Sequence, residues 1–153
     1  MKEKVIYVGF KGKNNFSGIL AESMSQEHLL LTNSFAGLKR DIESIPQAFD
    51  KAVMFGVDKA LTSGVRIERV AARDGETAAS KLDLEGLRDA LRAVGIESEI
   101  SENPTSYLCN DAYWHMLRKL SGQAVFIHVP TVRHMDEIPQ ENMKSAIAKW
   151  QQA

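Results

Sequence analysis

The chain has 153 residues, of which 44% are hydrophobic and 25% charged, and 19 basic against 20 acidic side chains give a formal net charge of −1. These values are typical of one globular domain, and they argue against disorder, a fibrous repeat and a nucleic-acid-binding protein with its usual basic excess. No apolar run approaches the ~20 residues that a membrane span requires. The length predicts a single domain over residues 1–153. Cys109 is the one cysteine and cannot form an internal disulfide, so we expect the protein in the reducing cytoplasm.

The first half of the chain alternates short apolar runs, which predict strands, with weaker helical patterns. The predicted strands are residues 4–10, 28–32, 52–57 and 65–71, and the predicted helices are residues 17–24 and 38–45. Pro46 ends the second helix. The polar stretch 73–80 (RDGETAAS) predicts a mobile loop.

The second half carries stronger signals. Apolar side chains at helical spacing predict helices around residues 84–94 and 139–150, and between them a helix with Tyr113, Leu117 and Leu120 on one face. Gly95 and Gly122 close the first two of these helices. Residues 96–101 and 124–129 (AVFIHV) predict strands. Strands therefore alternate with helices along the chain, which predicts an α/β fold: a three-layer α/β/α sandwich with a mostly parallel central sheet.

Several familiar ligand motifs are absent from the sequence. No G-x-G-x-x-G or G-x-x-x-x-G-K-[ST] pattern follows the first predicted strand, which argues against a dinucleotide site or a P-loop. The four histidines show no H-x-x-x-H or H-x-H spacing, one cysteine cannot form a zinc cage, and there is no G-x-S-x-G elbow. We therefore expect neither a cofactor nor a metal ion.

Cys109 lies at the start of a predicted helix, directly after the loop 102–105. The positive end of the helix dipole lowers the pKa of a thiol there and favours a reactive thiolate. The alternative, which position alone favours, is a small buried hydrophobic side chain.

Two further residues are candidates to act with Cys109. His128 ends the strand 124–129, and if the strand 96–101 runs parallel to it, both groups reach the same edge of the sheet. A thiol beside an imidazole is the arrangement that nucleophilic catalysis requires. The alternative is a core histidine bonded to backbone groups. Glu68 is a candidate to orient the imidazole, against the alternative of a surface glutamate paired with Arg66 or Arg69.

Taken together, these segments resemble the motifs of pyroglutamyl peptidase I (pyrrolidone-carboxylate peptidase), a family of cytoplasmic cysteine peptidases with a Glu-Cys-His triad. Tyr107-Leu108-Cys109-Asn110 is similar to the nucleophile motif, Phe126 to Pro130 (FIHVP) to the histidine motif, and Glu68 to Ala71 (ERVA) to the segment that bears the acid. Similar elements in the same order are Val8-Gly9-Phe10, Asn15-Phe16-Ser17, Ser34-Phe35 and Gly95-Ile96.

The resemblance implies roles for individual residues. Cys109 would be the nucleophile, His128 the general base and then acid, and Glu68 the group that orients the ring. Phe10 would line the pocket for the pyroglutamyl lactam, with Phe35 as a candidate second wall. Arg73 would take the place of the family's loop arginine near the oxyanion site.

The implied activity is removal of N-terminal pyroglutamyl groups from peptides or small amides through a thioacyl intermediate. The resemblance implies an activity without a cofactor, a metal ion, a nucleic acid or a membrane. It is compatible with a homo-oligomer.

The chain also departs from the family, whose members are longer. The aromatic segment after Phe10 is reduced to residues 11–14, the loop beyond Arg73 is trimmed to about residues 74–79, and the segment before Tyr107 reads NPTS in place of TAGT. Because these changes affect the pocket and the oxyanion site, two alternatives stay open: the same fold with a changed acyl or amide specificity, and a catalytically silent binding or interaction protein.

Overall fold

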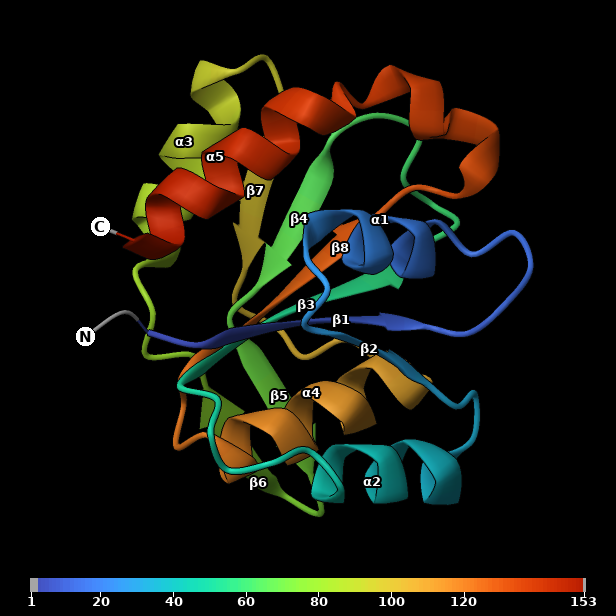
Figure 1. The fold of residues 1–153 in the computed structure, drawn as a ribbon, viewed down its shortest axis with the longest axis vertical. Coiled ribbons are helices and arrows are strands. Elements are labelled where there is room, and N and C mark those ends of the chain that lie inside the picture. The colour runs from blue at the N-terminus through green and yellow to red at the C-terminus, as the bar shows by residue number, and fades with distance from the viewer. Residues whose placement is uncertain (1–2, 153) are drawn as a thin grey trace.

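Six strands form the central sheet of the computed structural model, which describes residues 3–152 (Figure 1). In sheet order the strands are β2 (His28–Leu31), β1 (Val5–Phe10), β3 (Lys51–Val57), β8 (Ala124–Val129), β4 (Val65–Glu68) and β7 (Ser98–Ser101). The first four are parallel to one another, while β4 pairs antiparallel with β8 and parallel with β7. The mostly parallel sheet that the sequence predicts is confirmed.

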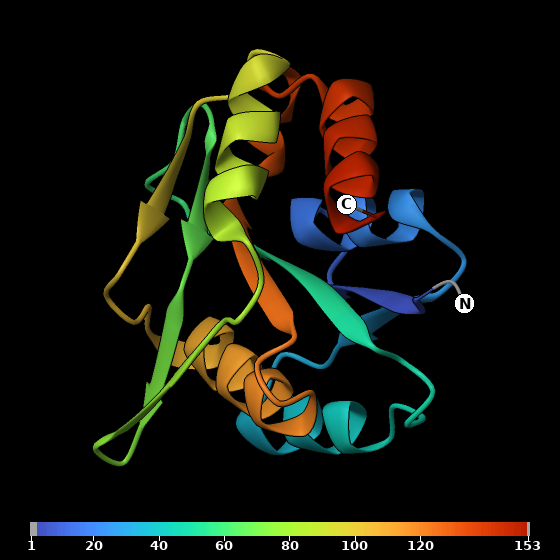
Figure 2. The same ribbon diagram turned by 90° about the vertical axis from the view of Figure 1, so that its left-hand side faces the viewer.

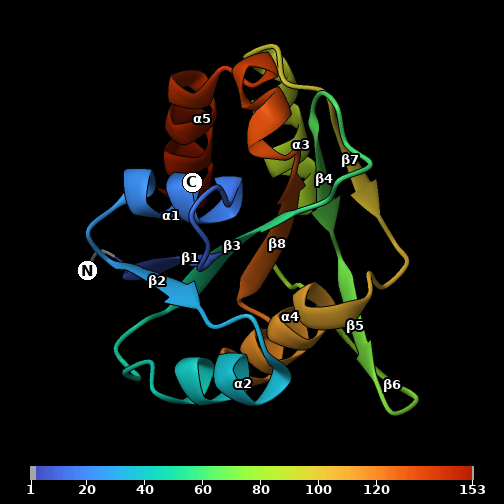
Figure 3. The same cartoon turned by 90° about the vertical axis from the view of Figure 1, so that its right-hand side faces the viewer.

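Helices cover both faces of this sheet (Figures 1 and 3). One layer holds α1 (Phe16–Met24), α3 (Leu84–Ala93) and α5 (Gln140–Gln152), and the other holds α2 (Phe35–Glu43) and α4 (Tyr107–Lys119). A short 3₁₀ helix, η1 (Val132–Glu137), connects β8 to α5. The predicted α/β/α layering is confirmed. None of the helices in residues 3–152 is both long and apolar enough to cross a membrane.

The strands are apolar on both faces because each face packs against a helix layer. Phe55 and Ile127 join the core beneath α1, α3 and α5, whereas their neighbours Met54 and Phe126 join the core beneath α2 and α4. Successive side chains of a strand point to opposite faces, so a strand buried on both sides is a continuous apolar run. This pattern explains why β1, β3 and β8 are visible in the sequence.

The stretch predicted as one strand, 65–71, is two strands, and the loop predicted at 73–80 is wrong. β4 ends at Glu68, and β5 (Val70–Arg73) forms an antiparallel hairpin with β6 (Glu76–Ala79) that projects from the body of the molecule (Figure 2). Asp74 and Gly75 form its turn with φ angles of 51° and 81°. Asp-Gly is a preferred pair for such two-residue turns because both positions need positive φ. The sequence carried this signal, and the polarity of the stretch obscured it.

The condition considered for a shared edge, that the strand 96–101 runs parallel to 124–129, is not met. β4 is antiparallel to β8, and β7 follows the direction of β4. The reason lies earlier in the chain: only seven residues, 58–64, join β3 to β4. A parallel crossover needs a dozen or more residues, so β4 must turn back at the edge where β3 ends.

Candidate active site

Alternation along β4 and β8 puts the candidate side chains on the face that α4 covers. Ile67 and Ile127 both point into the core beneath α1, α3 and α5. Their neighbours Glu68 and His128 therefore point to the other face. In the antiparallel register Arg66 lies opposite His128. The guanidinium of Arg66 and the carboxylate of Glu68, both on β4, therefore meet the imidazole of His128 on β8.

α4 carries Cys109 to the same place by a route that does not depend on β7. The helix ends at Lys119 and β8 begins at Ala124, so this short connection makes the helix run back along the strand. The first turn of α4 therefore lies over the carboxyl-terminal part of β8, where His128 stands. Cys109 is the third residue of the helix.

The absence of a side chain at Gly56 leaves space for the thiol of Cys109. Gly56 is the β3 partner of His128 in the sheet register. A Cβ atom added at Gly56 would lie 2.9 Å from the Cys109 Sγ and 2.5 Å from the Phe126 ring. Both distances are shorter than real contacts, so any side chain at position 56 would displace the thiol or the ring. The thiol thus lies over the β3–β8 pair, beside the strand position that carries His128.

Glu68 and His128 form a buried hydrogen-bonded pair. The Nδ1 of His128 lies 2.8 Å from the Oε2 of Glu68, and the two residues are 2% and 1% exposed. A carboxylate accepts hydrogen bonds only, so this contact assigns the ring proton to Nδ1 and leaves the lone pair on Nε2. The Phe126 ring packs against the imidazole at 4.9 Å between centroids and fixes its plane. The Nδ1 of His128 is therefore bonded to a side chain and not to backbone groups, which was the alternative that the sequence left open.

Arg66 adds a cation to this pair. Its Nε donates to the Oε2 of Glu68 at 2.6 Å, and its Nη2 donates to the Oδ2 of Asp58, which follows β3, at 2.7 Å. The two carboxylates raise the pKa of the Arg66 guanidinium, against the effect of its partial burial. Conversely, the hydrogen bonds from Ala60 and Arg66 lower the pKa of Asp58 despite desolvation. Glu68 does pair with Arg66, as the surface alternative supposed, but it does so in the interior.

The charge state of Cys109 differs from the sequence expectation. Burial raises the pKa of the thiol to about 12, the negative charges of Glu68 and Asp58 add to the increase, and Arg66 opposes it. The lowering of the thiol pKa that the helix start predicts is therefore outweighed by burial. In the unliganded protein Cys109 is a protonated thiol, partly exposed, and it needs a base to become a nucleophile.

Two residues that the sequence did not single out hold α4 in place. The amide of Asn110 pairs with the backbone of Ala72 in β5, accepting from its N–H at 3.0 Å and donating to its C=O at 2.7 Å. The hydroxyl of Tyr113 donates to the backbone C=O of Glu68 at 2.8 Å. Each contact spans about 40 residues of chain, so no local pattern could reveal it.

The three residues predicted to contact substrate lie in different surroundings. Phe10 ends β1 and is 4% exposed within the core beneath α2 and α4, whereas Phe35 begins α2 and is 54% exposed. Arg73 ends β5 and contacts the outer side of α4, 3.0 Å from the Nε2 of His115 and 3.5 Å from the Oδ1 of Asp111. Their roles at a substrate stay predictions.

Tyr107 is an exposed aromatic side chain to which the motif resemblance assigned no role of its own. It begins α4 two residues before Cys109, is 82% exposed, and has a φ angle of 59°. A positive φ is costly for a bulky residue, and such strain is concentrated at functional sites. The sequence did contain a signal for it: an aromatic residue two positions before the cysteine, at the start of the predicted helix.

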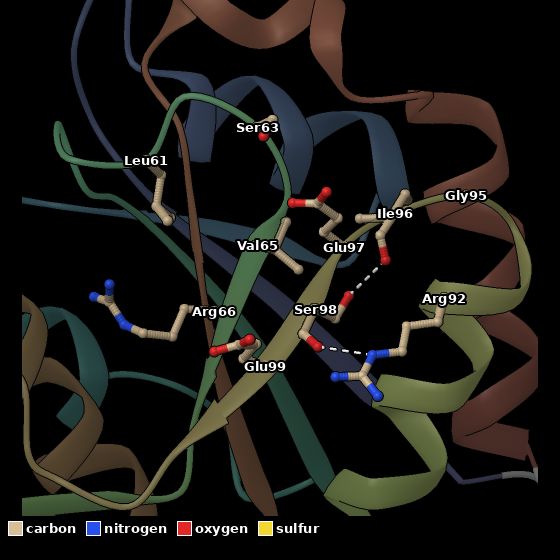
Figure 4. Close-up of a pocket in the computed structure, with 10 residues that line it drawn as sticks. All are labelled: Leu61, Ser63, Val65, Arg66, Arg92, Gly95, Ile96, Glu97, Ser98 and Glu99. Atoms are coloured by element: carbon tan, nitrogen blue, oxygen red, sulfur yellow. Dashed lines mark hydrogen bonds between the residues drawn. The ribbon is translucent and has the colours of Figure 1, made fainter.

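A surface pocket of about 680 Å³ lies beside this cluster, between the start of β4, the start of β7 and the end of α3 (Figure 4). It shares Arg66 with the cluster, and the guanidinium is turned to the side away from Arg92. Arg92 instead donates from Nε to the C=O of Ser98 on β7 at 3.0 Å. Within residues 3–152, no group of three or more His, Cys, Asp or Glu side chains is placed to hold a metal ion.

No protein-family model and no curated protein sequence matches the chain. Its fold, however, is similar to solved pyrrolidone carboxyl peptidases. The enzyme from Thermus thermophilus has a TM-score of 0.80 at 17% identity, over 97% of this chain and 98% of that one. Pyroglutamyl peptidase I from Bacillus amyloliquefaciens has a TM-score of 0.81 at 14% identity, over 95% of this chain and 93% of that one.

The enzyme from Thermococcus litoralis has a TM-score of 0.75 at 19% identity, over 98% of this chain and 94% of that one. The chain therefore has the fold of the pyrrolidone carboxyl peptidases along nearly its whole length, as a divergent example of it. This confirms, at the level of the fold, the resemblance that the motifs indicated.

Proposed function

We propose that the chain is a cytoplasmic cysteine hydrolase that removes N-terminal pyroglutamyl groups from peptides or small amides. The observation that carries the proposal is the buried Glu68–His128 hydrogen bond beside the thiol of Cys109. Burial of a carboxylate and an imidazole costs free energy, which the hydrogen bond between them offsets. The raised pKa of the neighbouring Cys109 thiol is a perturbation of the kind that clusters at active sites. The similar solved structures are named as pyrrolidone carboxyl peptidases.

The chemistry follows from the proton positions. The Nε2 of His128 takes the proton of Cys109 as Sγ attacks the pyroglutamyl carbonyl, which gives a tetrahedral oxyanion and an imidazolium. The C–N bond then breaks, and the imidazolium protonates the leaving amine. A water molecule, deprotonated by the same Nε2, attacks the thioester and releases pyroglutamate with the thiol restored. Glu68 keeps the ring in the required tautomer and stabilises the imidazolium in both steps.

The start of α4 provides donors for the oxyanion. Ser106 stands at the N-cap and makes no side-chain capping bond in the described part of the chain. The first N–H groups of a helix have no partner within the helix, and here they remain free to donate. They lie next to Sγ because Cys109 is itself in the first turn. Preorganised N–H donors of this kind are worth about 3–4 kcal/mol of transition-state stabilisation.

Recognition of the lactam would fall to the aromatic residues at this end of the sheet. Tyr107 and Phe35, at the starts of α4 and α2, are exposed aromatic side chains, and Phe10 would contribute from the core. A flat uncharged ring suits aromatic walls with a few backbone donors and acceptors. The walls are fewer than in the family pattern, because residues 11–14 carry no aromatic side chain.

The test is hydrolysis of matched pyroglutamyl and prolyl amide reporters. We expect the wild type to prefer the pyroglutamyl reporter, Cys109→Ala to show no turnover, and the control His28→Ala, at an exposed site on β2, to be unchanged. Loss of one aromatic wall relative to the family predicts a kcat/KM lower than that of a family member by about 10- to 200-fold. Turnover of neither reporter would refute the proposal.

A changed acyl specificity is the second candidate, and the burial of Phe10 favours it. A pocket wall that is 4% exposed offers little surface to a ligand. The same kinetics distinguish the two, because Cys109-dependent turnover that prefers the prolyl reporter assigns the chain to the second candidate.

A further inference from the structure

The sheet register arranges the groups of the proposed reaction in one row across four strands. Gly56 of β3 lies opposite His128 of β8, and the Cys109 thiol lies over this pair. His128 also lies opposite Arg66 of β4, which in turn lies opposite Glu99 of β7. Neighbouring strands are about 4.8 Å apart, so Glu99 stands about 10 Å from His128, on the side away from Gly56.

This row gives a direction to the substrate. A peptide bond is trans, so its acyl part and its leaving group point to opposite sides of the scissile bond. Phe10, the predicted lactam wall, ends β1, which lies beyond β3 from the position of His128. The acyl part therefore lies on the β1 side of the thiol. Because His128 protonates the leaving amine, the leaving peptide begins at the imidazole and continues over β4 towards β7.

The surface pocket of about 680 Å³ lies where this path ends. Arg66 and Glu99 line it (Figure 4). Apolar side chains also line it, namely those of Leu61, Val65 and Ile96. Its volume falls within the range of ligand pockets, about 300–1,000 Å³. An extended chain advances about 3.3 Å per residue, so the third residue of the leaving peptide reaches the position of Glu99.

The charges around the pocket favour a basic side chain. Glu97 and Glu99 line it with exposed side chains, and within residues 3–152 neither carboxylate forms an ion pair. Arg66, in contrast, is already paired with two carboxylates. Arg92 lies on the α3 side of the pocket and donates to a backbone C=O of β7 (Figure 4). Two unpaired carboxylates thus stand against one guanidinium that lacks a carboxylate partner.

We propose that this pocket is the subsite for the leaving peptide, and that Glu97 and Glu99 select a basic side chain at the third residue of that peptide. The inference rests on the proposed function, because the roles of Phe10, Cys109 and His128 give the substrate its direction. It narrows the substrate class from peptides or small amides in general to peptides with at least three residues after the pyroglutamyl group.

The kinetic experiment uses three peptides, pyroglutamyl-Ala-Ala-Xaa-Ala amide, in which Xaa is lysine, alanine or glutamate. We expect kcat/KM to be highest for lysine and lowest for glutamate. Each step should be about three- to fivefold, which corresponds to a partly exposed charge interaction. The preference should weaken at high salt, because salt screens exposed charges. Mass spectrometry of the released peptide measures each rate.

Two double variants test whether the pocket carries the preference. In Glu97→Gln/Glu99→Gln we expect the ratio of kcat/KM for the lysine and glutamate peptides to approach one. The matched control is Glu22→Gln/Glu43→Gln, which removes two exposed charges from α1 and α2. Both double variants change the net charge equally, so a general electrostatic effect would lower the ratio in both. We expect the control to keep the wild-type ratio, and circular dichroism establishes that both variants are folded.

Binding to Cys109→Ala tests the subsite without turnover. The lysine peptide is titrated into ¹⁵N-labelled Cys109→Ala, and amide chemical shifts give both the Kd and the location of the peptide. We expect the amides of Glu97 and Glu99 to shift, and the Kd of the glutamate peptide to be about tenfold higher, the product of the two steps expected in kcat/KM.

The outcomes separate the subsite from the proposed function. Equal or undetectable binding of the lysine and glutamate peptides, or shifts that leave the amides of Glu97 and Glu99 unchanged, overturns the subsite even if the wild type hydrolyses pyroglutamyl reporters. Selective binding with shifts at these amides, in a protein whose wild type hydrolyses no pyroglutamyl peptide, supports the pocket as a peptide site and refutes the proposed function.

Discussion

The two halves of the candidate site are held by different kinds of interaction. Glu68 and His128, the strand half, lie in the sheet interior and are joined by charged hydrogen bonds that include Arg66. Cys109, the helix half, is partly exposed, and α4 is held by bonds from Asn110 and Tyr113 to backbone groups. Charged hydrogen bonds within the sheet thus fix the positions of Glu68 and His128, whereas the docking of α4 fixes the position of the Cys109 thiol.

The strand half therefore controls proton transfer, whereas the docking of α4 controls the position of the thiol. A substitution in the strand half should change rates with little effect on how the helix sits. A substitution at the docking contacts should change stability and the position of the thiol together.

The largest expected effect tests the strand half alone. We expect His128→Ala to lower kcat/KM on the pyroglutamyl reporter by about 10²- to 10⁴-fold, because it removes the general base and acid. Glu68→Gln should cost less than His128→Ala, because the amide oxygen can still accept from Nδ1 but the variant lacks the charge that stabilises imidazolium. Equal losses in steady-state kinetics would mean that Glu68 does more than orient.

The second prediction concerns the reactivity of the thiol in the resting protein. With a pKa of about 12, Cys109 is protonated at neutral pH, and its thiolate fraction grows about tenfold per pH unit until pH approaches that value. We expect iodoacetamide to alkylate the protein at pH 7 at least tenfold more slowly than a free cysteine. Since Cys109 is the one cysteine, mass spectrometry of the whole protein measures the rate, with Cys109→Ala as the blank.

Alkylation at pH 7 that is faster than that of free cysteine would contradict this expectation. It would mean that the thiol and imidazole exist as an ion pair before substrate binds, and that the two halves are coupled at rest.

Gly56→Ala tests the contact between the halves. The added methyl group meets both the Phe126 ring and the Cys109 Sγ, so one of them must move. We expect a loss of about 1–3 kcal/mol in the free energy of unfolding, measured by urea denaturation. Cys109→Ala/Gly56→Ala should recover part of that loss, because it removes one of the two colliding atoms. Equal stability of the two variants would show that the ring alone absorbs the methyl group.

Asn110→Ala tests the docking of the helix half. It removes two hydrogen bonds to Ala72 and leaves the backbone groups of the hairpin strand without their partner. We expect a loss of about 1–3 kcal/mol in stability, smaller if water replaces the amide. Hydrogen exchange at the Ala72 amide should quicken in this variant, while exchange in β8 should not. Unchanged exchange at Ala72 would place the anchor of α4 elsewhere.

What could be predicted from the sequence was what local pattern determines. The continuous apolar run of β8 and the leucine spacing of α3 before Gly95 identify a buried strand and an amphipathic helix without any tertiary information. The motif resemblance brought together Glu68, Cys109 and His128, which are far apart in the chain.

What could not be predicted depends on distant neighbours. The pKa of Cys109 follows from its burial against Gly56 and from charges on β4, and the helix start alone pointed in the other direction. The direction of β7 follows from β4, whose reversal a count of the seven residues after β3 could have shown. Asp58, eight residues before Arg66 and in an ordinary polar loop, gave no signal of its contact with that side chain.

The bond from Arg92 to Ser98 has a consequence for how the molecule behaves in a crowded solution. β7 is the last strand of the sheet, and its bonds to β4 use the carbonyl groups of Glu97 and Ser101. The carbonyl of Ser98 faces outward, where an unpaired strand edge is a template for another chain. Arg92 occupies that carbonyl from the helix side, so sheet growth at this end meets a guanidinium instead of a free acceptor. One outward acceptor of this edge strand is therefore already paired, which reduces what the edge offers to a strand of another chain.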